Sequence, residues 1–139
     1  MPVHKRAREL VDAANAEIES ILAVDAIALV ERDDTTLVDL RDIRERIREG
    51  FVPGSLHAPR GMLEFWVDPD SPYHRDVFAT GKRFVFYCAS GWRSALATKA
   101  VQEMGLEPVC HIDDGFAGWV EAGGAVAKTE DGREPKPAS

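Results

Sequence analysis

The stretch FVFYCASGWRSALATKA, residues 84–100, decides the fold of this chain. Residues 84–87 are all apolar or aromatic, as expected of a strand that is buried on both faces. The residues that follow Arg93 are good helix formers and predict a helix. Between strand and helix lies a short turn, residues 88–93, which holds small side chains and one arginine. A strand, a tight loop and a helix N-terminus together form a site that can hold an anion, and this loop begins with a nucleophile, Cys88.

The rest of the chain predicts strands that alternate with helices. We expect an amphipathic N-terminal helix within residues 3–22, which packs on the domain or docks a partner. Asp25 is the expected N-cap of a brief helix through residue 30. Further strands are predicted at residues 21–24, 36–40, from 56, and 108–112, and further helices at 42–48, 61–66 and 114–119.

This order is typical of an α/β domain with a mainly parallel, five-stranded sheet flanked by helices. We divide the chain into an N-terminal helix (1–17), one domain (18–126) and a charged, proline-bearing tail (127–139) that we expect to be disordered. Ligands of such sheets bind beyond the carboxyl ends of the strands, which is where Cys88 falls.

The composition indicates one globular domain and limits its partners. The 139 residues are 45% hydrophobic and carry a net charge of −7, which argues against nucleic acid or an anionic membrane surface. The N-terminus has no apolar signal-peptide core and several acidic residues, so we expect a cytoplasmic protein. Two cysteines and four histidines lack metal-ligand spacing. We therefore expect no metal and no cofactor.

Charge is distributed unevenly along the chain. Residues 77–102 contain no acidic side chain but four cations, which favours an anionic substrate. Lys82, Arg83 and Lys99 have an equally good interpretation as side chains that solvate strand and helix ends. Arg93 lies within the loop itself and can offer a charged fork to an oxyanion. Whether Arg60 rims the pocket or lies on the surface stays open at this stage.

The loop environment favours the reactive form of the cysteine. Successive backbone N–H groups at a helix N-terminus point toward the thiol and stabilise a thiolate. Gly91 permits backbone conformations that other residues resist.

Four segments in order resemble the single-domain rhodaneses, sulfurtransferases of the thiosulfate sulfurtransferase type. Residues 37–41, LVDLR, resemble the early Val-Asp-x-Arg strand of that family. Residues 50–55, GFVPGS, resemble Gly-His-Ile-Pro-Gly-Ala, with Phe51 in place of the usual histidine. Residues 88–94, CASGWRS, resemble the active-site loop. Residues 113–119, DDGFAGW, resemble the closing Gly-Gly-x-x-x-Trp segment, with Asp114 in place of the first glycine.

The resemblance covers roughly residues 18–126 and implies a persulfide mechanism. Cys88 is the implied nucleophile, which takes sulfur from a small anionic donor such as thiosulfate and passes it to cyanide, a thiol or a protein cysteine. Asp39 and Arg41 are expected to support the loop, and Phe51 is given no role. The implied substrate-binding residues are those of the loop: Ala89, Ser90, Gly91, Trp92, Arg93 and Ser94.

Two other functions fit parts of the pattern. A related fold serves dual-specificity phosphatases, but their Cys-x5-Arg loop is one residue longer, whereas Arg93 is the fifth residue after Cys88. A non-catalytic rhodanese-like binding module commonly lacks the cysteine. Cys110, within a predicted strand, is expected to be a buried and inert thiol. The oligomeric state stays open.

Overall fold

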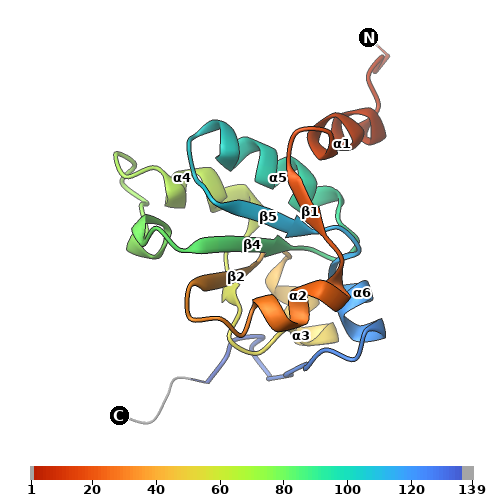
Figure 1. Cartoon of the computed structure of the whole chain (residues 1–139), viewed down its shortest axis with the longest axis vertical. Helices are drawn as coiled ribbons and strands as arrows, with labels where there is room; N and C mark the ends of the chain where they lie inside the picture. The colour runs from red at the N-terminus through yellow and green to blue at the C-terminus, as the bar shows by residue number, and fades with distance from the viewer. Residues whose placement is uncertain (1, 136–139) are drawn as a thin grey trace.

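Five parallel strands form one sheet among residues 2–135, the part of the chain that this computed structural model describes. Their order across the sheet is β1-β5-β4-β2-β3, so the strand before Cys88 lies at the centre (Figure 1). All four strand pairs are parallel. The strands are β1 (Glu19–Ile21), β2 (Thr35–Asp39), β3 (Leu56–His57), β4 (Arg83–Tyr87) and β5 (Val109–Ile112).

Helices cover both faces of the sheet. One face packs on α4 (Leu63–Val67) and α5 (Trp92–Glu103), which bury Phe84 and Phe86 of β4. The other face packs on α2 (Ala23–Leu29) and α6 (Gly115–Glu121), which bury Val85 and Tyr87. Side chains of a strand alternate between its two faces, so β4 is apolar throughout. Figure 1 shows α3 (Ile43–Glu49) on the side of α2 and α6.

Two short 3-10 helices, Arg60–Met62 and Asp76–Ala79, complete the irregular region around α4. The α/β prediction, the parallel sheet and the helix at residues 42–48 are confirmed. The first strand is shorter and earlier than predicted, and Asp25 lies inside the first turn of α2. The N-cap of α2 is Leu22, which has no capping side chain of its own.

The capping acceptor for α2 comes from a residue 91 positions further along the chain. The Asp114 carboxylate accepts a hydrogen bond of 2.8 Å from the backbone N–H of Ala23, at the first position of α2. Asp114 is also the residue that replaces a glycine of the family pattern. Gly118 accommodates it, because a side chain at that position would overlap the Asp114 carboxylate.

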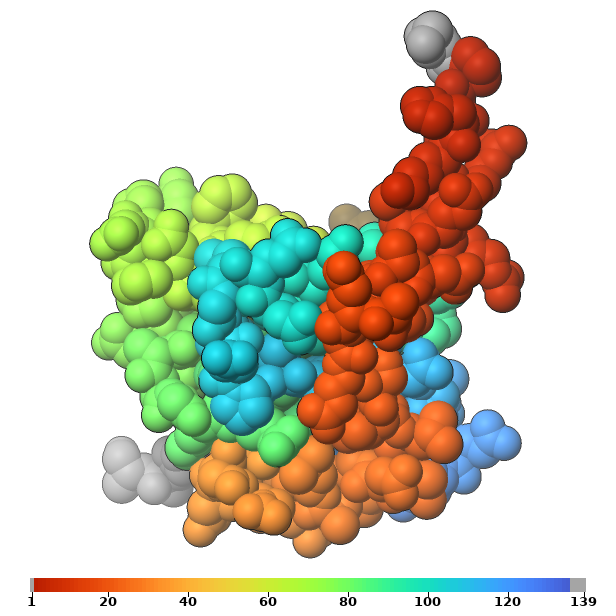
Figure 2. All heavy atoms as spheres, turned by 45° about the horizontal axis from the view of Figure 1, so that its top comes forward, coloured from red at the N-terminus to blue at the C-terminus, as the bar shows by residue number. Residues whose placement is uncertain are grey.

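The N-terminal helix α1 is shorter than predicted, Ala7–Asn15, and packs on α5. Val11 and Ala14 form a small buried cluster with Ala95. Residues before the helix extend away from the body of the molecule (Figure 2). None of the helices within residues 2–135 has the length and apolar character needed to span a bilayer.

The C-terminal segment differs from the prediction of disorder over residues 127–135. Ala127 forms an antiparallel bridge with Phe51, with N···O distances of 2.8 and 2.9 Å. Arg46 donates a 2.7 Å hydrogen bond to the Gly132 carbonyl, and its guanidinium lies 4.1 Å from the Phe51 ring centroid. Phe51 is therefore fully buried between the C-terminal segment, which pairs with its backbone, and Arg46 of α3. Composition suggested disorder, but backbone pairing does not depend on apolar side chains. Residues 136–139 lie outside the described part.

Candidate active site

The Cys88 thiol lies at the carboxyl end of the central strand, directly before the N-terminus of α5. Its Sγ accepts the N–H of Gly91 at 3.2 Å and the N–H of Ser94 at 3.4 Å. Cys88 is only 1% exposed. The sulfur is therefore placed where backbone dipoles and the helix N-terminus favour negative charge.

Two glycines let the backbone close around the sulfur. Gly91 has φ +97°, a left-handed conformation, and a side chain there would overlap the Asp113 carbonyl. Gly115 at the start of α6 lies directly against the loop, and a side chain would overlap the carbonyls of Ala89 and Cys88. The amide of Phe116 donates to the Cys88 carbonyl at 2.8 Å. The N-terminus of α6 therefore supports the loop from behind.

Asp39 and Arg41 form the centre of a buried polar network. Asp39 accepts both a 3.0 Å bond from Arg41 Nε and a 2.9 Å bond from Arg46 Nη1. Tyr87, the residue before Cys88, donates its hydroxyl to Asp39 at 2.8 Å. The Arg41 guanidinium also lies 4.2 Å from the ring centroid of Phe116. The network thus touches both the strand that carries Cys88 and the helix behind the loop.

The ionisation of this network follows from its pairing. Burial alone would raise the pKa of Asp39, but the hydrogen bonds and charge of Arg41 outweigh it and hold that pKa below its usual range. Burial raises the pKa of the Tyr87 hydroxyl well above its usual range. Asp39 is therefore a buried carboxylate and Tyr87 a neutral donor.

Arg93 does not present a free fork to solvent. Its two terminal nitrogens donate to the two carboxylate oxygens of Glu45 at 2.7 and 3.0 Å. This pairing holds the pKa of Glu45 below its usual range. Glu45 belongs to α3, where it completes a capping box with Asp42. Sequence reasoning missed this partner, although the spacing of Asp42 and Glu45 at a helix start was visible.

The other loop positions differ in exposure. Trp92 is 48% exposed, Ser90 is exposed and Ala89 is partly buried. Ser94 is fully buried, and its hydroxyl lies 3.4 Å from Cys88 Sγ and 2.8 Å from His111 Nδ1. The sequence assigned no role to His111, one of the four histidines that lack metal-ligand spacing. The available signal was its position between the apolar residues of a buried strand, where an imidazole requires polar partners.

A small cavity of about 220 Å³ lies beside the loop and is lined by Arg41, Arg60 and Arg93 together with Pro59. Each of these arginines has a carboxylate partner, and Arg60 pairs with Glu64 at 2.6 Å. Arg83 and Lys99 lie elsewhere and pair with Glu19 and Glu17. Arg60 thus joins the rim, while Arg83 and Lys99 have acidic partners of their own.

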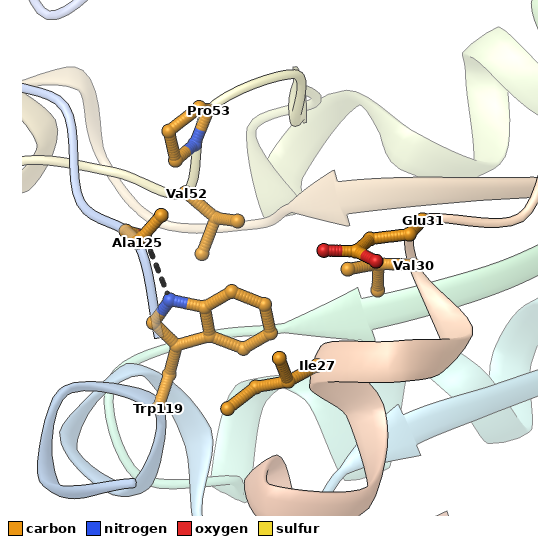
Figure 3. Close-up of a pocket in the computed structure, with 7 residues that line it drawn as sticks. All are labelled: Ile27, Val30, Glu31, Val52, Pro53, Trp119 and Ala125. Atoms are coloured by element: carbon orange, nitrogen blue, oxygen red, sulfur yellow. Dashed lines mark hydrogen bonds between the residues drawn. The ribbon is translucent and has the colours of Figure 1, made fainter. Parts of the chain in front are cut away.

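A second hollow, of about 250 Å³, lies between α2, α6 and the turn at Val52 (Figure 3). Trp119 forms one wall and donates its indole N–H to the Ala125 carbonyl at 2.8 Å. No lining residue belongs to the loop of residues 88–94. Cys110 is also remote from the loop chemistry, because it faces this side of the sheet, and burial raises its pKa to about 11.

Comparison with known proteins assigns the family. Residues 22–122 match the model of the rhodanese-like domain. A Bacillus subtilis protein named "Putative sulfurtransferase YtwF" is 29% identical over 74% of this chain and 91% of its own length.

Two solved structures extend the comparison. A Rhodopseudomonas palustris structure, described as a protein of unknown function and "Possible Tyrosine Phosphatase", is 49% identical with a TM-score of 0.88, covering 91% of this chain and 98% of its own. A rhodanese-related protein of Thermoplasma volcanium is 26% identical with a TM-score of 0.64, covering 78% and 97%. With a family model matched over most of its length, this chain belongs to the rhodanese-like domain family.

Proposed function

We propose that this chain is a sulfurtransferase that carries sulfane sulfur as a persulfide on Cys88. The observation that supports this most directly is the pair of backbone N–H groups, from Gly91 and Ser94, that already point at Sγ. The same donors suit an anionic persulfide, which carries one negative charge as the thiolate does, since they lie at the N-terminus of a helix of 12 residues.

The reaction is a double displacement. The Cys88 thiolate attacks the outer sulfur of thiosulfate, the S–S bond of the donor breaks, and sulfite leaves with the bonding electron pair. Cyanide or a thiolate then attacks the outer sulfur of the persulfide, and Cys88 departs as thiolate. The first half-reaction leaves Cys88 as an anionic persulfide, and the second returns it to the thiolate. No oxidant or metal is required.

The arginine-lined cavity is the proposed position of the sulfonate end of the donor. Arg41, Arg60 and Arg93 all line it, and a cavity of about 220 Å³ suits a small ion. Arg93 would then exchange part of its pairing with Glu45 for the donor oxygens. The low exposure of Cys88 also favours a small donor over a bulky one.

A phosphatase is the second candidate, because the similar Rhodopseudomonas palustris protein is described as a possible one. The loop argues against it here, since Arg93 follows Cys88 by five residues and is bound to Glu45. A tyrosyl phosphate also requires an accessible thiolate, whereas Cys88 is 1% exposed.

Intact-mass analysis after thiosulfate treatment tests the proposal. We expect one added sulfur atom, which cyanide removes, and no gain in the Cys88→Ser variant. An unchanged mass, together with hydrolysis of a phosphotyrosine analogue, would replace the sulfurtransferase with the phosphatase. An unchanged mass without hydrolysis would leave a binding module.

A further inference from the structure

A continuous chain of hydrogen bonds leads from the Cys88 thiol to the N-terminal helix. Ser94 Oγ lies 3.4 Å from Cys88 Sγ, and the same oxygen lies 2.8 Å from His111 Nδ1. On the far side of the ring, His111 Nε2 lies 3.0 Å from both Asn15 Oδ1 and Ser20 Oγ. Cys88, Ser94 and His111 are at most 1% exposed.

With Asn15 Oδ1 facing the ring, one set of proton positions satisfies the bonds from Cys88 to Asn15. The Oδ1 atom of Asn15 can only accept, so His111 Nε2 must carry the proton. His111 Nδ1 is then unprotonated and accepts from the Ser94 hydroxyl. Because that hydroxyl donates its proton to the imidazole, Ser94 Oγ is free to accept the proton of the Cys88 thiol.

We propose that His111 is the proton acceptor for the Cys88 thiol, acting through the Ser94 hydroxyl, and that Asn15 holds the imidazole in the required tautomer. The Sγ–H proton passes to Ser94 Oγ while the hydroxyl proton of Ser94 passes to His111 Nδ1. Sulfur retains the electron pair of the S–H bond. The product is a thiolate held by the Gly91 and Ser94 amides opposite a buried imidazolium.

The surroundings of His111 influence the proton transfer in two opposing ways. Burial lowers the pKa of the imidazole, which keeps the ring neutral before the transfer but disfavours the imidazolium that the transfer forms. The carboxylate of Asp113 lies 3.9 Å from Nε2. Its negative charge raises the pKa of the ring and would stabilise the imidazolium. The other acids on packed elements, Glu17 and Glu19, pair with Lys99 and Arg83. The charged residues of α1 are exposed.

The arrangement gives α1 a part in the site. Asn15 is the last residue of that helix, and α1 is held on α5 by Val11, Ala14 and Ala95. The N-terminal segment that stands out from the body in Figure 2 therefore ends at the imidazole behind the nucleophile. A shift in the position of α1 against α5 would therefore change how easily the Cys88 thiol loses its proton.

The test is the pH profile of Cys88 alkylation by iodoacetamide in the full chain, with the modified site located by peptide mass. His111→Gln should move the midpoint of the profile upward by about one pH unit or more, which slows alkylation at pH 7 roughly tenfold. Ser94→Ala should behave similarly, and the double variant should be no slower than the slower single variant. His74→Gln, a partly buried histidine bonded to a backbone carbonyl, is the matched control and should keep the wild-type profile.

Asn15 supplies a test of opposite signs. Asn15→Asp should move the midpoint downward, because a carboxylate stabilises the imidazolium, whereas Asn15→Leu should move it upward. A wild-type profile for His111→Gln, additive effects in the double variant, or equal shifts for both Asn15 variants would overturn the proposal. If His111→Gln does not fold, nitrogen NMR of the wild-type ring decides, since a proton on Nδ1 would also overturn it.

The proposal rests on the proposed function only in taking Cys88 as the nucleophile. Alkylation requires no sulfur donor, so the two can fail separately. A chain with the expected profiles that takes no sulfur from thiosulfate would retain the relay and lose the sulfurtransferase function.

Discussion

At the scale of single residues, Cys88 and Cys110 have opposite surroundings. Cys88 accepts two backbone N–H bonds, while burial raises the pKa of Cys110 to about 11. Cys88→Ser should abolish persulfide formation, because a serine oxygen cannot hold a transferable sulfur atom. Cys110→Ser should keep the turnover of the wild type and lose some stability through a buried hydroxyl. A Cys110→Ser variant that is folded by circular dichroism but has lost turnover would contradict this assignment.

The ion pair of Arg93 with Glu45 makes the role of the arginine testable. If Arg93 binds the donor, Arg93→Ala should lower kcat/KM for thiosulfate by roughly 10- to 150-fold, the equivalent of about 1.5–3 kcal/mol. Glu45→Gln should raise it about two- to fivefold, since it removes a competing carboxylate whose interaction with a half-exposed arginine is worth about 0.5–1 kcal/mol. Steady-state kinetics of both variants measures this.

The opposite result for Glu45→Gln would assign Arg93 a structural role. If kcat/KM falls as much in Glu45→Gln as in Arg93→Ala, the ion pair holds α3 against α5 and Arg93 does not bind the donor. Arg60→Ala is the companion variant, because Arg60 lines the same cavity but has a partner, Glu64, on its own segment.

The sequence predicted the residues of the candidate site but not their pairing. Cys88, Gly91 and the loop could be found because strand, turn and helix are contiguous. The partners of Arg93 and Ser94 are 48 and 17 residues away along the chain, and only the packed fold brings them together. A local sequence pattern indicates the chemistry of a side chain. Which charged partner that side chain contacts depends on the tertiary structure.

At the scale of elements, helix termini carry several long-range contacts. The N-terminus of α6 supports the Cys88 loop, and Asp114 just before it caps α2. Sequence periodicity located these helices but placed the cap of α2 wrongly at Asp25. The error has a physical reason: local rules assume that a helix is capped by its own flank, and here a residue 91 positions away provides the acceptor.

Removal of this cap should be measurable. Asp114→Ala should lower the free energy of unfolding by about 0.5–2 kcal/mol, the usual cost of losing an N-cap acceptor. Urea unfolding followed by circular dichroism gives the difference. Asp70→Ala, an exposed aspartate in a loop, is the control and should lie within about 0.5 kcal/mol of wild type. Equal stability of the Asp114 and Asp70 variants would mean that the Ala23 amide is satisfied without the carboxylate.

At the scale of the whole molecule, order extends further than composition suggested. The segment from Ala127 to Gly132 is tied to Phe51 and Arg46 by backbone carbonyls and amides. Its charged side chains are typical of a disordered segment, but its backbone amides and carbonyls form the hydrogen bonds that attach it to the domain. The parallel sheet and its helices were predictable because periodicity and turn residues repeat along the chain. The attachment of the C-terminal segment was not, because it depends on single long-range bonds.

The molecule as a whole should lose stability in mildly acidic solution. Burial lowers the pKa of His111 and of His57, so both bind protons more readily in the unfolded chain, where the usual pKa is about 6.5. Their contribution is therefore complete above about pH 6.5 and is lost as the pH falls toward the folded values. For the fully buried His111 the slope is at most about 1.4 kcal/mol per pH unit. The half-buried His57 contributes less, because solvent screens it.

Urea unfolding at pH 7.5, 6.5 and 5.5 tests this window, which lies above the titration of most carboxylates. Wild type should show a declining profile, and His57→Gln should be flatter, because glutamine does not titrate. His111→Gln should be the flattest of the three, although less stable at pH 7.5 because it lacks the Ser94 and Asn15 bonds. A wild-type slope in His111→Gln would show that His111 binds protons equally in the folded and unfolded chains, which would contradict the lowered pKa of the buried imidazole.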